Sequence, residues 1–299
     1  MPSQQNTRRR PMQRARLDGA GTELEYEILG APAGEPVVLI HGALIAEAYA
    51  PLCAEPALAD RYQLVRYHRR GYAGSARAPA PFGIAQQAAD CLALLRHLGL
   101  ERAHVVGHSS AGPMALQLAL DAPEAVHTLV LLEAALLDVP SGALIPAAVG
   151  PAIERYQAGE KEAATDGFLR WAVGPGYRAH LDRLIPGAFA QAVADADTWF
   201  AVELPSLQEW RFTQADAARI SQPVLAVLGA ESGADWPGWP EVHERVQAWL
   251  PQTEPFVLPG ANHALQEMDP RGIAEALAAF FAYHPIPAPA ALPVLAGAH

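Results

Sequence analysis

The 299-residue chain has little of several residue types that mark particular classes of protein. Its two cysteines, Cys53 and Cys91, are too few for a disulfide framework or a cysteine-based metal site. Its 21 Lys and Arg residues are outnumbered by 32 Asp and Glu residues, and a net charge of −11 argues against a nucleic-acid partner. No apolar run is long enough to span a membrane, so we expect no membrane partner either.

Both ends of the chain lack the pattern of a folded core. The opening MPSQQNTRRRPMQRAR is basic and has no apolar signal-peptide stretch, so we expect residues 1–19 to form a disordered leader. Residues 285–299 are rich in Pro and Ala, which favours a flexible tail. These features together favour a cytoplasmic location. Histidines and carboxylates lack the spacing of metal ligands, and we expect no metal and no cofactor.

Between the two ends, short apolar runs alternate with helical patterns. The alternation predicts an α/β fold, with a mostly parallel central sheet and helices on both of its faces. The segment before the first expected strand could pair with it as a hairpin. The expected strands are 22–29, 36–42, 62–68, 103–107, 127–133, 223–229 and 254–260, and the expected helices are 84–99, 110–121, 240–250 and 270–283.

One interval interrupts the alternation. Residues 135–220 contain no convincing strand and are rich in Ala, so we expect a helical cap inserted into a core made of 20–134 and 221–284. Aromatic residues are scattered through this interval. They either pack inside the cap or line a pocket, and the candidates for the pocket are Trp171, Trp199, Phe200 and Trp210.

The stretch VVGHSSAGPM, residues 105–114, places two serines between a strand pattern and a helix pattern. A nucleophilic serine on a sharp strand-to-helix turn needs small residues two positions before and after it, because strand and helix pack closely there. Gly107 and Ala111 flank Ser109 in this way, whereas the bulky His108 lies two positions before Ser110. The sequence therefore predicts Ser109 as the nucleophile.

The chain resembles the α/β-hydrolase family over most of residues 20–283. The motifs that carry the resemblance are LIHGA (39–43), RYHRRGYAGS (66–75), VVGHSSAG (105–112) and LPGANHALQEMDP (258–270). His68 stands where the family usually has Asp, and Ala111 replaces the second Gly of G-x-S-x-G. The resemblance implies an oxyanion hole from the backbone amides of Ala43 and Ser110, and a His108 that points away from the reacting side.

The resemblance also indicates where the partners of Ser109 lie. The base is expected on a loop after the last strand, where His263 follows a Pro-Gly turn. The acid has two family locations. Glu133, at the end of an apolar strand, occupies one of them and is the favoured acid, while Glu231 and Asp235 flank the other and stay open as alternatives.

These residues predict a serine hydrolase of the carboxylesterase or lactonase type, with a catalytic triad. Its expected partner is a small-molecule substrate, a small to medium and mainly apolar ester or lactone cleaved through an acyl-enzyme. Two alternatives stay open: a non-hydrolytic enzyme on the same fold, such as a lyase or a cofactor-free oxygenase, and a ligand-binding, receptor-like protein. The sequence makes no prediction of oligomeric state.

Overall fold

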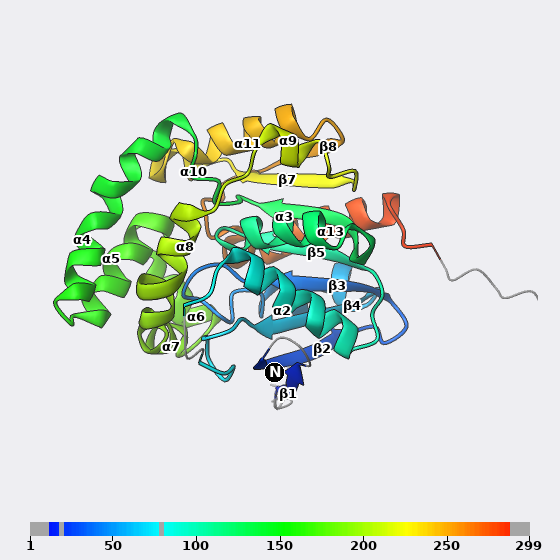
Figure 1. The fold of residues 1–299 in the computed structure, drawn as a ribbon, viewed down its shortest axis with the longest axis horizontal. Coiled ribbons are helices and arrows are strands. Elements are labelled where there is room, and N and C mark those ends of the chain that lie inside the picture. The colour runs from blue at the N-terminus through cyan, green and yellow to red at the C-terminus, as the bar shows by residue number, and fades with distance from the viewer. Residues whose placement is uncertain (1–11, 18–20, 78–80, 288–299) are drawn as a thin grey trace, which may run out of the picture.

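A single eight-stranded sheet organises the chain, whose computed structural model describes residues 12–17, 21–77 and 81–287 (Figure 1). The strand order is β1-β2-β4-β3-β5-β6-β7-β8, and all neighbours are parallel except β1 with β2 and β2 with β4. The strands are β1 Gln13–Leu17, β2 Thr22–Gly30, β3 Glu35–Ile40, β4 Tyr62–His68, β5 Ala103–His108, β6 Val126–Leu132, β7 Val224–Gly229 and β8 Thr253–Leu258.

Helices connect the strands and cover both faces of the sheet. In Figure 1 the helices α2 and α3 lie in front of the sheet and α13 lies behind it. The α-helices of the described residues are α1 Pro56–Ala59, α2 Ile84–His97, α3 Ala111–Asp121, α4 Ile145–Gln157, α5 Lys161–Val173, α6 Tyr177–Leu184, α7 Ala188–Ala194, α8 Leu204–Glu209, α9 Gln214–Ala217, α10 Ser232–Asp235, α11 Gly238–Trp249, α12 Leu265–Met268 and α13 Pro270–Tyr283.

The central strands are apolar on both sides, as a sheet covered on both faces requires. Along β3, Val38 and Ile40 join the core cluster that contains α2 and α3, while Val37 and Leu39 join the cluster that contains α13. All four side chains are fully buried. The predicted α/β fold with a mostly parallel sheet is therefore confirmed.

The expected leader is wrong for Gln13–Leu17, which form β1 and pair with β2 in an antiparallel hairpin. Ala15 and Leu17 are both 2 % exposed, so every second residue of the strand faces the core. Arginines at the alternate positions face outward, and Arg14 lies 3.6 Å from Glu23 across the hairpin. The hairpin that was expected before the first strand is confirmed, and only the disordered-leader assignment is wrong here. Residues 1–11 and 18–20 lie outside the described residues.

The stretch between β6 and β7, which is described throughout, contains helices and no strand. We call residues 135–220 the helical region. In Figure 1 its helices α4 to α8 lie together at the left, at the carboxyl ends of the parallel strands. A π-helix, Thr198–Glu203, precedes α8. Open α/β sheets bind ligands at this edge, so the helical region covers the expected place for a site.

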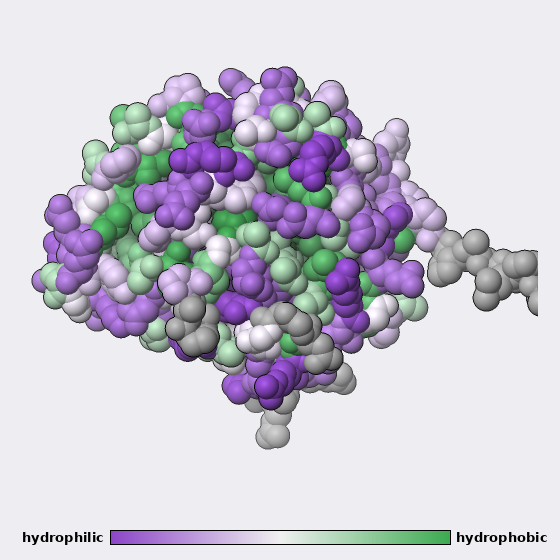
Figure 2. Space-filling model, in the orientation of Figure 1, coloured by the Kyte–Doolittle hydropathy of each residue, from purple (hydrophilic) through white to green (hydrophobic). Residues whose placement is uncertain are grey.

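The surface carries few large exposed apolar side chains. Hydrophilic and hydrophobic residues are mixed over the face seen in Figure 2. Within the described residues, the helices fall short of the length and apolarity that a membrane span requires. Residues 288–299, most of the expected tail, lie outside the described residues.

Candidate functional site

Ser109 occupies a left-handed turn between β5 and α3, with a φ of 54°. The turn is tight: a Cβ on Gly107 would lie 2.7 Å from the Ala111 carbonyl oxygen, so only glycine fits there. The turn presents the Ser109 side chain to a cavity at the carboxyl edge of the sheet. The neighbouring Ser110 hydroxyl is buried and has no hydrogen-bond partner among the described residues.

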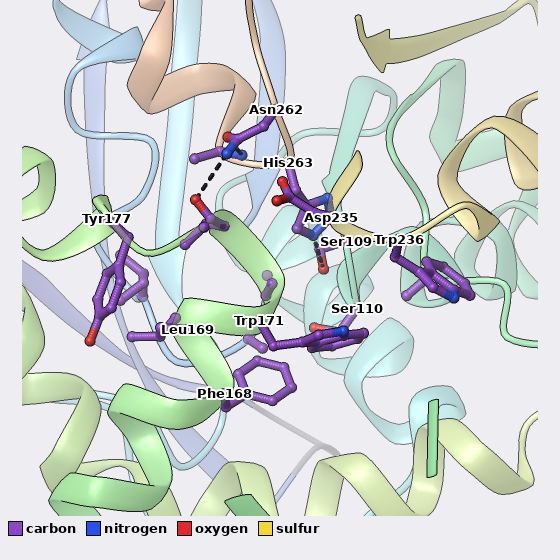
Figure 3. Close-up of a pocket in the computed structure, with 18 of the residues that line it drawn as sticks. Ser109, Ser110, Phe168, Leu169, Trp171, Tyr177, Asp235, Trp236, Asn262 and His263 are labelled. Atoms are coloured by element: carbon purple, nitrogen blue, oxygen red, sulfur yellow. Dashed lines mark hydrogen bonds between the residues drawn. The ribbon is translucent and has the colours of Figure 1, made fainter. Parts of the chain in front are cut away.

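His263, on the loop after β8, lies between Ser109 and Glu133. Figure 3 shows the Ser109 side of this arrangement. Its Nε2 is 2.9 Å from Ser109 Oγ, and its Nδ1 is 2.6 Å from Glu133 Oε2. The carboxylate can only accept, so Nδ1 carries the proton and Nε2 is left to accept from the serine hydroxyl. The structure thus brings together the three residues that the sequence singled out first.

Glu133 follows β6 and, like Ser109, has a left-handed backbone, with a φ of 45°. Its side chain is buried, and its second oxygen, Oε1, accepts a hydrogen bond from the Gly229 amide at 2.6 Å. A buried carboxylate needs such donors, because burial without them is costly. With Gly229 and His263 as donors, each oxygen of Glu133 has one.

The two alternative candidates for the acid, Glu231 and Asp235, make no hydrogen bond to His263 among the described residues. Glu231 is exposed at the start of α10. Asp235, at the end of α10, is half-buried and lines the cavity beside His263 without a hydrogen bond to it (Figure 3). Burial raises the pKa of Asp235, although the nearby His263 opposes the shift. Only Glu133 among the three candidates contacts His263 Nδ1.

The amides of Ala43 and Ser110 belong to residues that line the cavity next to Ser109. Neither amide donates a hydrogen bond to another described residue, so both are available to a ligand. The loop after β3 passes close to the serine, because a Cβ on Gly42 would lie 3.1 Å from Ser109 Cβ. The arrangement meets the requirement for two backbone donors near one nucleophile.

The cavity above Ser109 has a volume of about 430 Å³ and is lined mainly by apolar side chains from the helical region (Figure 3). Trp171 and Trp199, two of the four predicted pocket residues, belong to its wall. Phe168 contacts both tryptophans, with ring centroids 5.6 and 5.0 Å away. A cavity of this size suits a small to medium ligand.

The other two predicted pocket residues lie outside this wall, and their assignment to the pocket is wrong. Phe200 is buried inside the helical region, stacked on Tyr156 with centroids 5.0 Å apart. Trp210 stacks on Phe212 at 5.9 Å, and its Nε1 donates to Gln117 Oε1 at 2.8 Å. Both side chains pack within or beside the helical region, which was the alternative that the sequence left open.

Two further tryptophans, which were not predicted from the sequence as site residues, lie beside His263. The Trp239 ring stacks on the His263 imidazole, with centroids 3.8 Å apart and an angle of 14° between the planes. Trp236 meets Trp239 edge-on at 4.8 Å. Both belong to the segment DWPGWP between β7 and the body of α11. A loop that follows a parallel strand lies at the carboxyl edge of the sheet, where ligands bind. The position of these tryptophans after β7 could therefore have indicated that they lie near the site.

His108 does not point away from the reacting side, and this expectation is wrong. Its ring lines the cavity and lies 4.9 Å from the His263 ring. Its Nε2 donates to the His263 carbonyl at 2.9 Å, and its Nδ1 accepts from Gln266 Nε2 at 3.1 Å. Burial lowers the pKa of His108 to about 3, and nearby His263 contributes. His108 is therefore neutral and holds the backbone of the His263 loop.

Glu267, on α12, is a second buried carboxyl group in the cavity wall. Burial raises its pKa to about 8, so the group holds its proton at neutral pH. Its Oε2 has no hydrogen-bond partner among the described residues. An unpaired buried carboxyl is stable only in the neutral form, which matches its surroundings.

Metal ligation has no candidate in the part of the chain that the structure describes. No group of three or more His, Cys, Asp or Glu side chains there is arranged to hold a metal ion.

The family model described as "alpha/beta hydrolase fold" matches residues 35–270, most of the sequence. The chain belongs to the alpha/beta hydrolase fold family. The matched range of the hydrolase-fold model includes Ser109, Glu133 and His263.

Curated relatives and solved structures fit this family. The chain is 29% identical over 289 residues to "Rhodomycin D methylesterase DnrP" of Streptomyces peucetius, covering 86% of this chain and 93% of that protein. It is 38% identical over 110 residues to "Putative carbamate hydrolase RutD" of Caulobacter segnis, which covers 36% of this chain and only 41% of that relative. An esterase from Thermogutta terrifontis superimposes with a TM-score of 0.76 at 21% identity, covering 91% and 99% of the two chains. The family and these names together support a hydrolase.

We predict that Glu267 makes the stability of this hydrolase-fold protein depend on pH. The ordinary pKa of glutamate is 4.5, and the folded value is about 8. Between these values the unfolded chain has lost a proton that the folded chain keeps, so raising the pH favours unfolding, by up to about 1.4 kcal/mol per pH unit. Urea unfolding of wild type and Glu267→Gln should therefore diverge from pH 5 to 8 in favour of the variant. Parallel profiles would contradict the buried neutral carboxyl.

Proposed function

We propose that the protein is a serine hydrolase that cleaves a small to medium, uncharged and mainly apolar ester or lactone through an acyl-enzyme. The observation that carries the proposal is the chain of hydrogen bonds from Ser109 Oγ to His263 Nε2 at 2.9 Å and from His263 Nδ1 to Glu133 Oε2 at 2.6 Å. Nucleophile, base and orienting acid are in reach of one another, as acyl transfer requires.

In the first half of the proposed cycle, Ser109 Oγ attacks the carbonyl carbon of the substrate. His263 Nε2 takes the hydroxyl proton, and Glu133 stabilises the resulting imidazolium. The negative charge that develops on the carbonyl oxygen is received by the amides of Ala43 and Ser110. When the carbon–oxygen bond breaks, His263 gives the proton to the leaving alkoxide and the acyl group stays on Ser109.

In the second half, water replaces the alcohol. His263 removes a proton from the water, the hydroxide attacks the acyl carbon, and the proton passes to Ser109 Oγ as the acid leaves. With a lactone, the alcohol and the acid belong to one molecule, so the product is a hydroxy acid. Trp239 covers one face of the His263 ring throughout, and its π-face favours the imidazolium.

The cavity wall argues for an uncharged substrate. Among the described residues that line it, the ionisable side chains include Asp235 and Glu267 but no Lys or Arg. A carboxylate on the substrate would therefore be buried without a cationic partner, which is costly. The relative DnrP, which aligns over most of this chain, is named as a methylesterase, and this supports ester cleavage.

Labelling with a fluorophosphonate tests the class of the enzyme and the identity of its nucleophile. We predict modification of Ser109, located by peptide mapping, in wild type and in Ser110→Ala, which keeps the Ser110 amide. Ser109→Ala should lose labelling and about 10⁶-fold of kcat on a neutral p-nitrophenyl ester. A folded wild type that is neither labelled nor able to hydrolyse any ester would favour a non-hydrolytic enzyme or a receptor.

Exchange of the acid tests the assignment of Glu133. Glu133→Gln should lower kcat by about 10⁴-fold, because the amide can donate to Nδ1 and favours the wrong tautomer of His263. Glu231→Gln, at an exposed position, serves as the matched control and should leave kcat near the wild-type value. The reverse order of the two variants in steady-state kinetics would move the acid to the loop after β7.

A pair of esters tests the predicted charge of the substrate. An ester with an apolar acyl chain should be hydrolysed with a kcat/KM at least about 100-fold higher than the same chain ending in a carboxylate. The two substrates share their leaving group, so the difference measures the cavity and not the chemistry. Equal kcat/KM values for the two esters would contradict the exclusion of a carboxylate from the cavity.

A further inference from the structure

Arg69, which follows β4, is a buried arginine outside the cavity wall that binds the loop carrying Ala43. The side chain is 1 % exposed. Its Nε donates to the His41 carbonyl at 2.8 Å, and its Nη2 donates to the Gly42 carbonyl at 2.9 Å. The guanidinium therefore fixes the two carbonyl groups that come directly before the Ala43 amide.

The Gly42 carbonyl and the Ala43 amide belong to the same peptide unit. That unit is planar and trans, so its C=O and N–H point in opposite directions, and holding the oxygen sets the direction of the N–H. His41 Nδ1 also donates to Gly42 O, at 2.8 Å, while His41 Nε2 accepts from the Arg69 amide at 3.0 Å. A positive charge at the carbonyl end also polarises the unit and strengthens its N–H as a donor.

The same guanidinium reaches the helical region through Glu203. Arg69 Nη2 lies 3.1 Å from Glu203 Oε2, Nη1 contacts Glu203 Oε1, and Tyr72 donates its hydroxyl to Oε2 at 2.6 Å. Glu203 is also 1 % exposed at its side chain, and its charge raises the pKa of Arg69 although burial opposes this. Arg69 is thus a charged link between the β3 loop and the π-helix that ends at Glu203.

The π-helix also reaches the cavity. Trp199 lies within it and Leu204 directly follows it, and both residues line the cavity wall. Glu203 stands between them in the chain but points to Arg69 instead. The segment that would contact substrate is therefore tied to the peptide that would receive the oxyanion.

We propose that Arg69 is a positioning residue that orients the Gly42–Ala43 peptide as an oxyanion donor, and that Glu203 couples this orientation to the helical region. The inference rests on the proposed function, because it assigns a role in acyl transfer. Arg69 contacts neither substrate nor the reacting atoms; it acts through the peptide that it holds.

The neighbouring Arg70 provides a matched control. It is also buried, at 7 % exposure, and pairs with a buried carboxylate, Asp90, through Nε at 2.8 Å and Nη2 at 2.7 Å. Asp90 lies on α2, and the hydrogen bonds of Arg70 to Asp90 do not involve the His41 or Gly42 carbonyl. Arg69→Lys and Arg70→Lys each keep a positive charge and lose the planar fork, so both disturb a buried pair but only one releases the Gly42 carbonyl.

For Arg69→Lys we expect kcat on a neutral p-nitrophenyl ester to fall by about 10- to 100-fold with KM little changed. The inhibition constant of a boronic acid, whose anionic adduct on serine occupies the oxyanion position, should rise by a similar factor. Arg70→Lys should keep kcat and this inhibition constant near their wild-type values. Equal losses in both variants, or a rise in KM alone, would overturn the proposal.

Tyr72→Phe keeps the proposal testable if Arg69→Lys does not fold. This variant removes only the hydroxyl that holds Glu203, and it should lower kcat by a smaller factor, again with KM unchanged. An unchanged kcat would contradict the coupling through Glu203. Fluorophosphonate labelling of wild-type Ser109 separates the proposed function from the proposed role of Arg69. Failure of wild type to label rejects the proposed function. If wild type is labelled and Arg69→Lys keeps the wild-type kcat, only the role of Arg69 is rejected.

Discussion

The left-handed backbone at Ser109 is the constraint on which the rest of the site depends. A non-glycine residue in this conformation costs about 1–3 kcal/mol, so the surroundings must hold it. The Ser109 amide donates to Leu132 O at 3.0 Å, and its carbonyl accepts from the amides of Gly112 and Ala135, both at 2.9 Å. Two of these partners lie at the end of β6 or just after it. The neighbouring strand therefore fixes the bend, and the absence of a side chain at Gly107 leaves room for it.

The same neighbouring strand leads to Glu133. β5 and β6 are parallel partners, and each is followed by a residue with positive φ, so both side chains leave the sheet at its carboxyl edge. His263, on the loop after β8, bridges the two side chains by a hydrogen bond to each of them. The amide of Gly229, the last residue of β7, donates to Glu133 Oε1 and helps to hold the carboxylate in place.

Much of this arrangement could be predicted from the sequence, because its signals are local. The strand lengths, the small residues around Ser109 and the Pro-Gly turn before His263 are each visible in a short stretch of sequence. Trp239 and Glu267 were missed because their nearness to the site depends on how two loops fold over the sheet edge. Phe200 was misplaced for the opposite reason, since a helix pattern does not tell which face turns to the cavity. The pairing of Gln13–Leu17 was expected from its place before the first strand, whereas its arginines led to the wrong assignment of the same residues to a leader.

Charged side chains join the helical region to the rest of the molecule near the loop after β3. On the side of the β3 loop it is joined to the sheet by the buried pair of Arg69 with Glu203, and nearby Arg77 Nη2 lies 2.6 Å from Asp195 Oδ1. On the side of His263, Asn262 Nδ2 donates to Val173 O at 2.9 Å, and Ser141 of the helical region donates to the Glu241 carboxylate on α11 at 2.6 and 2.8 Å. Separating a buried ion pair exposes two uncompensated charges to a poor solvent, whereas a neutral hydrogen bond exchanges with water at little net cost. Parting the helical region from the loop after β3 would therefore leave Arg69 and Glu203 as two uncompensated charges.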